Sequence, residues 1–565
     1  MSDAKHYYLT TPIYYVNDVP HIGHAYTTLA CDVMARYKRT RGFEVSFLTG
    51  TDEHGQKVEK AAHAKGETPL ELADRVVKRF QSLWDKLNIS HTDFIRTSQE
   101  RHKLAVQEIF RIIEAKGDIY LGEYEDWYCT PCETFWTETQ LLDGNCPDCG
   151  RPTDKLKEES YFFRMSKYQE QLLAHIDANP DFIQPKTRRN EIISFVREGL
   201  RDLSISRTTF SWGIPVPNNE KHVIYVWFDA LTNYISALGF GSGDDAGYRQ
   251  FWPATVHLVG KDILRFHCVY WPAFLMSAGL PLPKQVFGHG WWLQDDAKMS
   301  KSVGNVVAPE KVIKQYGAEI LRLWVATQDY RNDTRVGDAI LKQVSEAYRR
   351  IRNTARYILG NIHDFDPATD SVADHELCEI DRWALSRLEG LVNRVLQAYE
   401  AYDFHVLYHA VHNFCAVDMS AFYLDVLKDR LYTSAKQGPA RRSAQTAMYR
   451  ILDALTRMMA PVLSFTAEEI WGFLPGKREA SAHLAEFPSF QASLVNTELE
   501  AKYDRLLAVR SDVAKVLELA RAGKTIGHSL DARVELAAGR LEILDTVVAE
   551  HFNERRIGRD NVALA

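Results

Sequence analysis

The sequence predicts an α/β protein with a doubly wound parallel-sheet domain that is split by an insertion and followed by a mostly helical region. Strand-like and helix-like segments alternate in two separate blocks, over the first hundred residues and again from about residue 223. Beyond about residue 310 strand signals become sparse, and helical periodicity dominates from 340 to 475. Alternating βαβ units form parallel sheets, whereas long runs of helical periodicity predict a helical domain.

The first block contains one complete βαβ unit. Residues 7–10 form a short β-prone run, and residues 24–37 carry apolar side chains at nearly helical spacing. Residues 43–48 then alternate between apolar and polar side chains and end just before Gly50. Strand, helix and strand in this order predict two parallel strands joined by a crossover helix.

The second block carries three further strand-like runs, 223–227, 255–259 and 285–288. The residues between the two blocks interrupt the alternation, which is why we predict an insertion. The predicted organisation is residues 1–115 for the first half of the sheet domain, 116–222 for the insertion, 223–310 for the second half, 311–475 for a linker and helical domain, and 476–565 for a C-terminal helical extension.

Composition excludes several classes of protein. The chain has 565 residues, of which 45% are hydrophobic and 25% charged, which is typical of globular rather than disordered or fibrous proteins. No apolar run approaches the ~20 residues of a membrane helix, and the N-terminal residues lack the apolar stretch of a signal peptide. We therefore expect a cytoplasmic protein. Because the net charge is −7, any contact with nucleic acid must come from local basic patches.

Four of the eight cysteines form two short pairs, Cys129–Cys132 and Cys146–Cys149, separated by thirteen residues. Two such knuckles can place four thiolates in a tetrahedron around zinc. All four positions are cysteines, which leaves no open coordination position and predicts a structural metal. The alternative is a pair of structural or redox-active CxxC motifs without metal.

Two segments are candidates for binding phosphate. His21, Gly23 and His24 stand where the first strand-like run should lead into its helix, and a helix N-terminus with a nearby glycine suits a nucleotide phosphate. Lys298, Ser300 and Lys301 belong to a polar loop, and two ammonium groups can stabilise the charge on a departing pyrophosphate. The alternatives are a histidine with only a structural role and a solvated basic loop.

These two segments resemble the two signatures of class I aminoacyl-tRNA synthetases, and residues 6 to about 305 resemble the methionyl-tRNA synthetases of that class. The resembling stretches are 10–17, 49–57, 225–230 and 260–267, together with the four-cysteine knuckle. The resemblance implies a Rossmann-type catalytic domain with a zinc-binding insertion. It also implies ATP-dependent activation of L-methionine and its ligation to tRNA, with Mg²⁺ bound together with ATP.

The resemblance also assigns roles to individual residues. Asp52 would bind the α-amino group of the amino acid, and Gly260 and Asp262 would hold the adenosine. An aromatic wall suits a thioether, because contacts between sulfur and aromatic rings are favourable. The implied lining of the side-chain pocket is Ile13, Tyr15, Trp227, Tyr234, Ile263 and His267, and the implied ATP-phosphate residues are His21, Gly23, His24, Lys298, Ser300 and Lys301.

Residues from about 307 to 540 resemble a different enzyme of the class, isoleucyl-tRNA synthetase. The resembling stretches are 316–326, 345–354, 422–431 and 526–530, and they imply an α-helical anticodon-binding bundle. Because the two halves then point to different amino acids, we expect a pocket that selects methionine and a bundle that favours the isoleucine anticodon.

A basic stripe on one helix is the candidate tRNA contact. Arg349, Arg352 and Arg356 recur at helical spacing, and Asn353 lies beside them. Arginine and amide side chains on such a face can bind RNA phosphates and exposed bases. Many arginine stripes are only solvated faces, and this alternative stays open.

Two classes of function compete for the whole chain. The first is an ATP-dependent amino-acid–tRNA ligase with methionine specificity, or with isoleucine specificity contributed by the C-terminal half. The second is a non-catalytic, zinc-containing tRNA-binding protein. The intact histidine, aspartate and lysine set favours the enzyme, so we expect ATP, L-methionine and tRNA as partners, no membrane association, and a monomer or homodimer.

Overall fold

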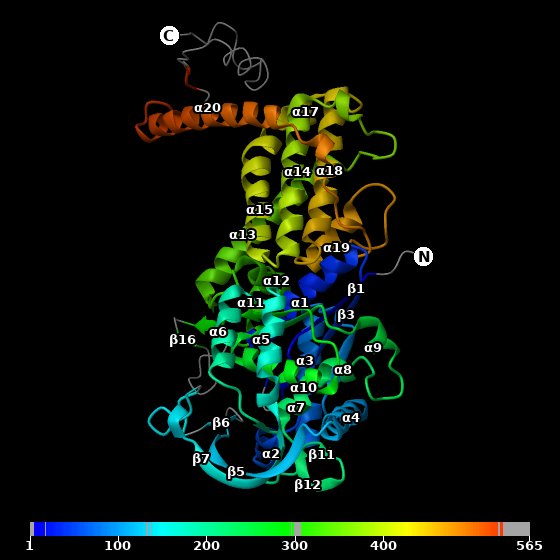
Figure 1. Ribbon diagram of the computed structural model, residues 1–565. Coiled ribbons are helices and arrows are strands. Elements are labelled where there is room, and N and C mark those ends of the chain that lie inside the picture. Colours follow the sequence, from blue (N-terminus) through cyan, green and yellow to red (C-terminus); the bar gives the residue numbers. More distant parts are fainter. Residues whose placement is uncertain are drawn as a thin grey trace.

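A parallel-sheet domain forms one end of the molecule, and a bundle of long helices extends from it (Figure 1). The computed structural model describes residues 5–16, 19–130, 134–136, 138–147, 149–294, 297–298, 307–528 and 531–534. The predicted split α/β domain followed by a helical region is confirmed.

The central sheet has seven strands, and all of its strand pairs are parallel. The strand order is β2-β3-β1-β13-β14-β8, and β4 also pairs with β3. The bounds are β1 (His6–Thr10), β2 (Tyr14–Tyr15), β3 (Glu44–Asp52), β4 (Asp93–Arg96), β8 (Ile183–Gln184), β13 (Val256–Gly260) and β14 (Val286–His289).

Helices cover both faces of this sheet, as its apolar side chains require. Along β1, Tyr7 and Leu9 belong to one buried core and Tyr8 belongs to a second, because successive side chains of a strand point to opposite faces. Helices α1 (Ile22–Thr40), α2 (Gln56–His63) and α3 (Pro69–Lys86) contribute to the first core, and α4 (Glu100–Ala115) and α10 (Trp271–Ala278) contribute to the second.

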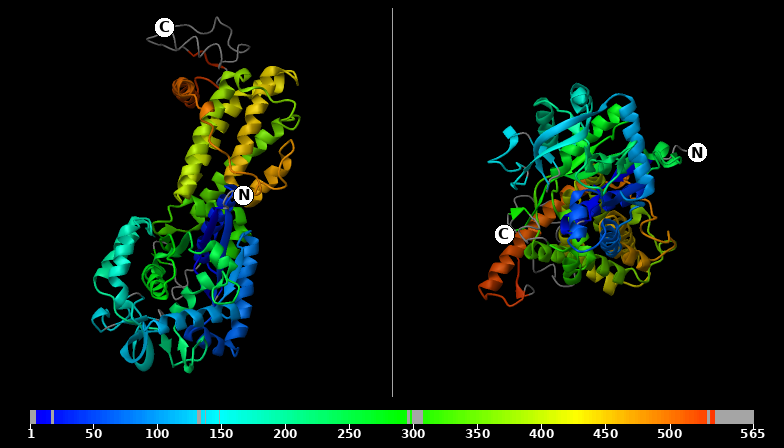
Figure 2. Two further views of the ribbon diagram at one scale, coloured as in Figure 1. Left: turned by 45° about the vertical axis from the view of Figure 1, so that its right-hand side comes forward. Right: turned by 90° about the horizontal axis from the view of Figure 1, so that it is seen from below.

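The insertion lies to one side of the sheet domain (Figure 2). Its main feature is an antiparallel sheet of β6 (Thr134–Trp136), β5 (Ile119–Cys129), β7 (Asp154–Phe163) and β9 (Leu203–Ser204), followed along the chain after β7 by α5 (Gln169–Ala178) and α6 (Lys186–Arg197). The insertion also supplies β8, which pairs with β14 at the edge of the central sheet. The insertion therefore contributes a strand to the central sheet, which the sequence does not reveal.

The structure corrects the predicted strand at 223–227. Strand β12 (Asn219–Ile224) ends earlier and pairs with β10 (Ser206–Arg207) and β11 (Pro215–Val216) in a separate antiparallel sheet. Helix α7 (Val226–Leu231) begins at once and is followed by α8 (Asn233–Ser236) and α9 (Ala246–Phe251). The apolar run is buried, and a short buried run fits either a strand or a helix. The domain boundaries themselves stay predictions.

The helical half continues the first core of the sheet domain. The buried cluster that contains Leu9 also contains Trp324 and Trp383, so one apolar core extends from the sheet into the bundle. The helices are α11 (Pro309–Tyr316), α12 (Ala318–Thr327), α13 (Asp338–Asn361), α14 (Glu379–Glu400), α15 (Phe404–Asn413), α16 (Leu424–Val426), α17 (Lys428–Thr433), α18 (Pro439–Met459), α19 (Ser464–Phe473) and α20 (Thr497–Ala522). Helix α20 lies across the far end of the bundle (Figure 1).

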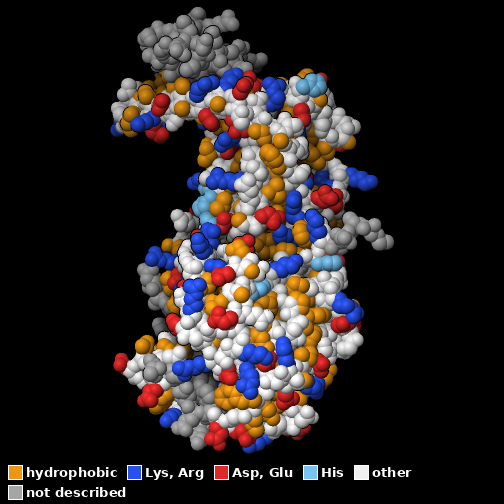
Figure 3. Space-filling view, in the orientation of Figure 1, with side chains coloured by type: hydrophobic (Ala, Val, Ile, Leu, Met, Phe, Trp, Pro, Cys, Tyr) orange, Lys and Arg blue, Asp and Glu red, His pale blue; other side chains and the backbone are white. Residues whose placement is uncertain are grey.

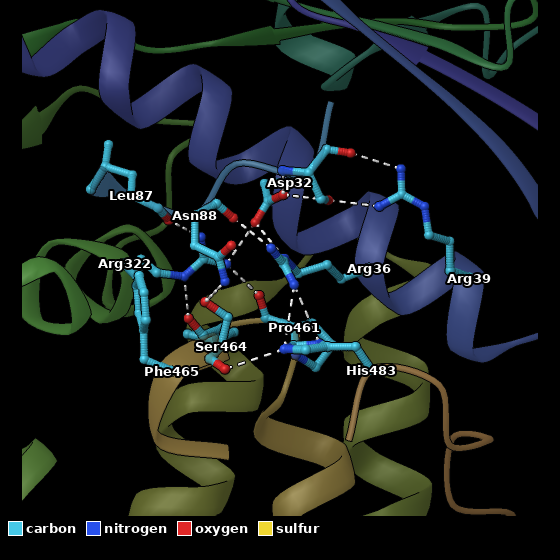
Figure 4. Close-up of polar contacts among 12 residues, drawn as sticks. Asp32, Arg36, Arg39, Leu87, Asn88, Arg322, Pro461, Ser464, Phe465 and His483 are labelled. Carbon is cyan, nitrogen blue, oxygen red and sulfur yellow. Dashed lines mark hydrogen bonds and ion pairs between the residues drawn. The ribbon is translucent and has the colours of Figure 1, made fainter. Parts of the chain in front are cut away.

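A buried charge cluster joins the two halves (Figure 4). Arg322 of α12 binds the Asp32 carboxylate of α1 at 2.7 Å, and Arg36 binds the same carboxylate at 2.8 Å. Burial alone would raise the pKa of Asp32, but the two guanidinium groups hold it well below its usual range. The other partners of Arg322, all at 2.8 Å, are the backbone carbonyls of Leu87, Pro461 and Val462.

The molecular surface carries both signs of charge. On the face drawn in Figure 3, Lys and Arg side chains are interspersed with Asp and Glu side chains on both halves. Among the helices that the structure describes, none combines the length and the apolar character needed to span a membrane.

Candidate active site

A cavity of about 850 Å³ opens at the carboxyl ends of the central parallel strands. Ligands bind in such crevices in open α/β sheets. All of the described residues assigned to the amino acid and the adenosine line it, together with the candidate histidine pair: Ile13, Tyr15, His21, Gly23, His24, Asp52, Trp227, Tyr234, Gly260, Asp262, Ile263 and His267. These residues therefore line one cavity, and the roles assigned to them stay predictions.

The two histidines cap the N-terminus of α1. The backbone N–H of Gly23 donates to His21 Nδ1 at 3.2 Å, and the backbone N–H of His21 donates to His24 Nδ1 at 3.3 Å. An imidazole nitrogen that accepts a hydrogen bond carries no proton, so in both neutral rings the proton is on Nε2. The rings stack with centroids 3.6 Å apart.

This arrangement changes the expected phosphate donors. The N–H groups of Ile22 and Gly23 are already bonded, to the Val307 carbonyl at 3.1 Å and to His21 respectively. These two amides are therefore already engaged, and the side chains of this motif that line the cavity are the two imidazole rings. Gly23 is required here for another reason: a Cβ atom at this position would lie 2.6 Å from the Trp292 ring.

One wall of the cavity contains a histidine held in its neutral form. His267 Nδ1 donates to the Ile263 carbonyl at 2.9 Å, so its Nε2 accepts from the Tyr234 hydroxyl at 2.7 Å. Burial lowers the pKa of His267 to about 4. Trp227 completes this wall and stacks on Phe266 with centroids 3.7 Å apart. The wall is aromatic and polar but uncharged near neutral pH.

Charged side chains also line the cavity. Asp52 ends strand β3 and is 5% exposed, and its neighbour across the β2–β3 pairing is Tyr15. The Lys57 ammonium lies 4.9 Å from the centre of the Tyr15 ring. An aspartate in this position can bind a ligand ammonium group.

Of the two residues that the resemblance assigns to the adenosine, Gly260 ends β13 and Asp262 follows two residues later. A Cβ atom on residue 260 would lie 2.5 Å from Asp262 Oδ1, so glycine lets the carboxylate fold over the turn. The neighbouring His289 donates from Nδ1 to the Gly290 carbonyl at 2.8 Å and accepts from the Thr27 hydroxyl at 2.9 Å. Burial lowers the pKa of His289.

Several cavity residues escaped the sequence prediction. They are Lys57, Lys261, Arg265, Phe266, His289, Trp291 and Trp292. Lys57, Lys261, Arg265 and Phe266 lie within the resembling stretches 49–57 and 260–267 but were given no role. His289 also had a usable signal, since it stands between two glycines at the end of a strand-like run.

The lysine loop is described only in part. Lys298 ends β16 (Ala297–Lys298), which pairs with β15 (Trp292–Gln294), and β15 in turn pairs with β17 (Thr334–Arg335). This pairing connects Lys298 to a strand that begins at the cavity residue Trp292. Ser300 and Lys301 lie outside the described residues, and the roles of all three remain predictions.

Three of the four predicted metal ligands come together. The Sγ atoms of Cys129, Cys146 and Cys149 lie within 4.8 Å of one another, and the Cys129–Cys149 distance is 3.6 Å. Two sulfurs on a tetrahedral zinc with Zn–S bonds of ~2.3 Å lie about 3.8 Å apart, so the thiols fit the ion. Cys132 lies outside the described residues. Cys149 and Pro147 also line the cavity, which the sequence did not indicate.

The arginine stripe lies on α13 as predicted. Arg349, Arg352, Asn353 and Arg356 are exposed, whereas Ile351, Ala355 and Ile358 are buried. Arg349 pairs with Glu346 at 2.7 Å. A groove of about 310 Å³ between α13 and α19 is lined by Arg352 and Arg356, together with Phe473 and Ile470.

Comparisons with known proteins identify both halves. The family model of class I tRNA synthetases (M) matches residues 7–156 and 151–345, and the model of the anticodon-binding domain of tRNA ligase matches residues 381–536. A methionine–tRNA ligase of Clostridium perfringens is 59% identical over 322 residues, covering 57% of this chain and 50% of that protein. The alignable segment thus spans about half of that relative.

Longer matches extend beyond the catalytic half. The methionine–tRNA ligase of Halalkalibacterium halodurans is 44% identical over 83% of this chain and 73% of its own length. That of Bacillus subtilis is 38% identical over 99% of this chain and 93% of its own length. The second alignment corrects the expectation that the chain departs from methionyl enzymes beyond about residue 307. The resemblance to isoleucyl enzymes in that region stays a prediction.

Solved structures agree with this relationship. A Mycobacterium tuberculosis methionyl-tRNA synthetase in complex with methionyl-adenylate superposes with a TM-score of 0.77 at 40% identity, covering 83% of this chain and 93% of that one. Its apo form superposes with a TM-score of 0.71 at 36% identity, covering 83% of this chain and 91% of that one. The chain therefore belongs to the methionyl group of the class I tRNA synthetases.

Proposed function

We propose that this chain activates L-methionine with ATP to methionyl adenylate and transfers the methionyl group to the 3′ end of tRNA, releasing pyrophosphate and AMP. One observation carries the proposal. A single cavity brings together the Asp52 carboxylate, the uncharged wall around His267, and the His21–His24 pair at the start of α1.

The methionine end of the cavity follows from charge and polarizability. The Asp52 carboxylate would bind the α-ammonium group of the substrate. Trp227, Tyr234 and His267 would contact the thioether, whose interactions with aromatic rings are worth ~0.3–1.5 kcal/mol each. Because His267 is neutral, this wall presents no charge that a thioether would have to desolvate.

The phosphate end acts by positioning and by charge stabilisation. The substrate carboxylate attacks the α-phosphorus in line with the departing pyrophosphate, so the protein needs no nucleophile. The Nε2–H groups of His21 and His24 would donate to phosphate oxygens as charge develops on them. Lys298 and Lys301 would stabilise the pyrophosphate, and Mg²⁺ carried by ATP would neutralise part of its charge.

We also propose that the cysteine cluster holds one structural zinc ion. Cys129, Cys132, Cys146 and Cys149 would be its ligands, and this knuckle borders the cavity at Pro147 and Cys149. Purified protein should contain about one zinc per chain, and Cys146→Ser should lower both metal content and thermal stability. Cys31→Ser, which removes a thiol buried in the sheet domain, is the control and should keep the metal. Metal-free protein of unchanged stability would refute this site.

For tRNA, the proposed contact surface is the exposed stripe of α13 and the groove beside it. Arg352 and Arg356 contribute charge there, and Phe473, which is 71% exposed, contributes an apolar face on which a base can stack. A non-catalytic tRNA-binding protein would need only this surface. The complete cavity favours the enzyme.

The decisive experiment is amino-acid-dependent ATP–pyrophosphate exchange, run with methionine, isoleucine and the other amino acids separately. Methionine should stimulate exchange and isoleucine should not. Charging of methionine tRNA should follow. Exchange stimulated by isoleucine would refute the assigned substrate, and tRNA binding without any exchange would favour the non-catalytic alternative.

A further inference from the structure

A carboxylate between two imidazoles lies buried behind the amino-acid cavity. Asp229 of α7 receives hydrogen bonds from His54 Nδ1 and from His102 Nε2, each at 2.7 Å, and the three side chains are 0%, 3% and 0% exposed respectively. His102 Nδ1 lies 2.8 Å from the Ser236 hydroxyl. We call Asp229, His54, His102 and Ser236 the Asp229 cluster.

The hydrogen bonds of this cluster are consistent with one charge state. Burial alone would raise the pKa of Asp229, but its His54 and His102 partners more than offset that effect, and the pKa lies below its usual range. An ionised carboxylate only accepts hydrogen bonds, so both imidazoles donate to it. On the other side of its ring, His102 Nδ1 forms a hydrogen bond with the Ser236 hydroxyl. All four side chains are thereby fixed in orientation.

The positions of the cluster members along the chain relate them to the cavity. His54 stands two residues after Asp52, Asp229 two residues after Trp227, and Ser236 two residues after Tyr234. Among the described residues that line the cavity, those three predecessors are present and the cluster members are absent. The three segments that carry Asp52, Trp227 and Tyr234 are therefore each anchored by a member of the cluster.

Within the cluster, His102 is the member that lies on a long, well-packed helix. It belongs to α4, a 16-residue helix packed in the second core, whereas α7 and α8 have only six and four residues. The loop after β3 has an additional anchor, because Trp212 Nε1 donates to the Glu53 carbonyl at 2.5 Å. Short helices and loops need such support if their side chains are to stay in binding geometry.

We propose that Asp229 is a positioning residue for methionine binding: through its cluster it holds Asp52, Trp227 and Tyr234 in the geometry that fits the amino acid. This inference rests on the proposed function. It predicts that damage to the cluster weakens methionine binding selectively, because the cluster touches the segments of the amino-acid end and not the His21–His24 end of the cavity.

Asp229→Asn is the first test. The amide has the size of the carboxylate, but its NH₂ group faces an imidazole N–H, so one of the two hydrogen bonds is lost. In the exchange assay we expect KM for methionine to rise about 10- to 100-fold, as for other residues that orient binding groups. KM for ATP should change less than threefold. A purely structural role would not separate the two substrates in this way.

Asp118→Asn is the matched control. Asp118 is also a buried carboxylate, with 1% exposure, and it accepts hydrogen bonds from Ser277 at 2.8 Å and from Tyr168, away from the cavity. It should lose stability without a selective change in KM for methionine. If Asp229→Asn behaves like this control, with both KM values unchanged, the inference is wrong.

A second pair of variants keeps the test decisive if Asp229→Asn does not fold. His54→Asn retains an N–H donor near the position of Nδ1, whereas His54→Ala removes it. Methionine KM should be closer to that of the unmodified protein in His54→Asn than in His54→Ala. Equal KM values would overturn the inference. Unmodified protein without methionine-dependent exchange would instead refute the proposed function, and the inference with it.

Discussion

The cavity and the groove on the bundle place their functional side chains in opposite environments. In the cavity, His267, Tyr234 and Asp52 are almost fully buried, and His267 and Tyr234 are locked together by a hydrogen bond of 2.7 Å. On α13, Arg352 and Arg356 are exposed on one face of a regular helix. A buried polar group needs particular partners, whereas an exposed arginine needs only solvent.

This difference determines how much free energy each site can contribute. Removing a partner inside the cavity or the core leaves a desolvated group behind, which costs several kcal/mol. Removing an exposed cation costs only its own screened contact. We therefore expect large effects on activation and stability in the sheet half, small effects on tRNA binding in the bundle, and the largest effect where the two halves join.

The largest effect is predicted for Arg322→Met at that junction. The substitution leaves the Asp32 carboxylate with Arg36 as its ion-pair partner and Ser90 as its hydrogen-bond donor, and it leaves three backbone carbonyls without the Arg322 donor. Breaking a buried ion pair from one side costs ~3–5 kcal/mol, so the urea midpoint should fall accordingly. The double variant Asp32→Asn/Arg322→Met should be less destabilised than the two single effects added together. Strict additivity would show that the pair does not couple.

The next effect is acid sensitivity caused by His267. Its pKa is about 4 in the folded protein and near 6.5 in an unfolded chain, so below pH ~6.5 the unfolded state binds a proton that the folded state excludes. The free energy of unfolding should therefore fall as pH drops from ~6.5 to 4, by ~3 kcal/mol from this group.

Urea titrations at several pH values measure this loss. His267→Gln should flatten the slope of stability against pH, and His363→Gln, at an exposed position of the bundle, should not. An unchanged slope in His267→Gln would show that other groups, such as the buried His257, account for the acid sensitivity.

Asp52→Asn tests the charged side of the cavity. The amide keeps the size of the carboxylate but loses its charge, so kcat/KM for methionine in the exchange assay should fall about 10- to 100-fold, the value of a charge-assisted hydrogen bond. KM for ATP should stay within about threefold. Asp85→Asn, an exposed carboxylate on α3, is the control. A larger change in ATP binding than in methionine binding would assign Asp52 to the wrong substrate.

The same contrast between buried and exposed groups explains what the sequence could predict. The βαβ pattern predicted β1, α1 and β3. Short motifs pointed to Asp52, Trp227 and His267, because few types of residue can occupy a buried polar position next to a ligand. The Asp229 cluster was not predicted from the sequence, because His54, His102 and Asp229 lie far apart in the chain and only the fold brings them together. For the same reason β8 could not be assigned to the central sheet.

On the bundle, sequence reasoning was less specific. The helical stripe predicts which face of α13 is exposed, but exposure alone does not identify a ligand. The tyrosine that follows Arg356, Tyr357, shows this: its position next to the stripe suggests a base contact, whereas in the structure its hydroxyl donates to the Leu424 carbonyl at 3.2 Å. The groove beside the stripe depends on α19, more than a hundred residues further along the chain, and only the fold reveals it.

The smallest effect is predicted for this stripe. Arg352→Gln and Arg356→Gln should each weaken tRNA binding modestly and reduce the slope of log affinity against log salt by ~0.7–0.9, because each removes one phosphate contact. Methionine-dependent exchange without tRNA should be unchanged, since neither residue lines the cavity. Lys342→Gln is the control: this residue lies on the same helix but is exposed beside Asp338, to which it is paired at 2.8 Å. If Lys342→Gln lowers the salt slope as much as the arginine variants do, tRNA binding reflects only the overall charge of α13, and the groove is not its contact site.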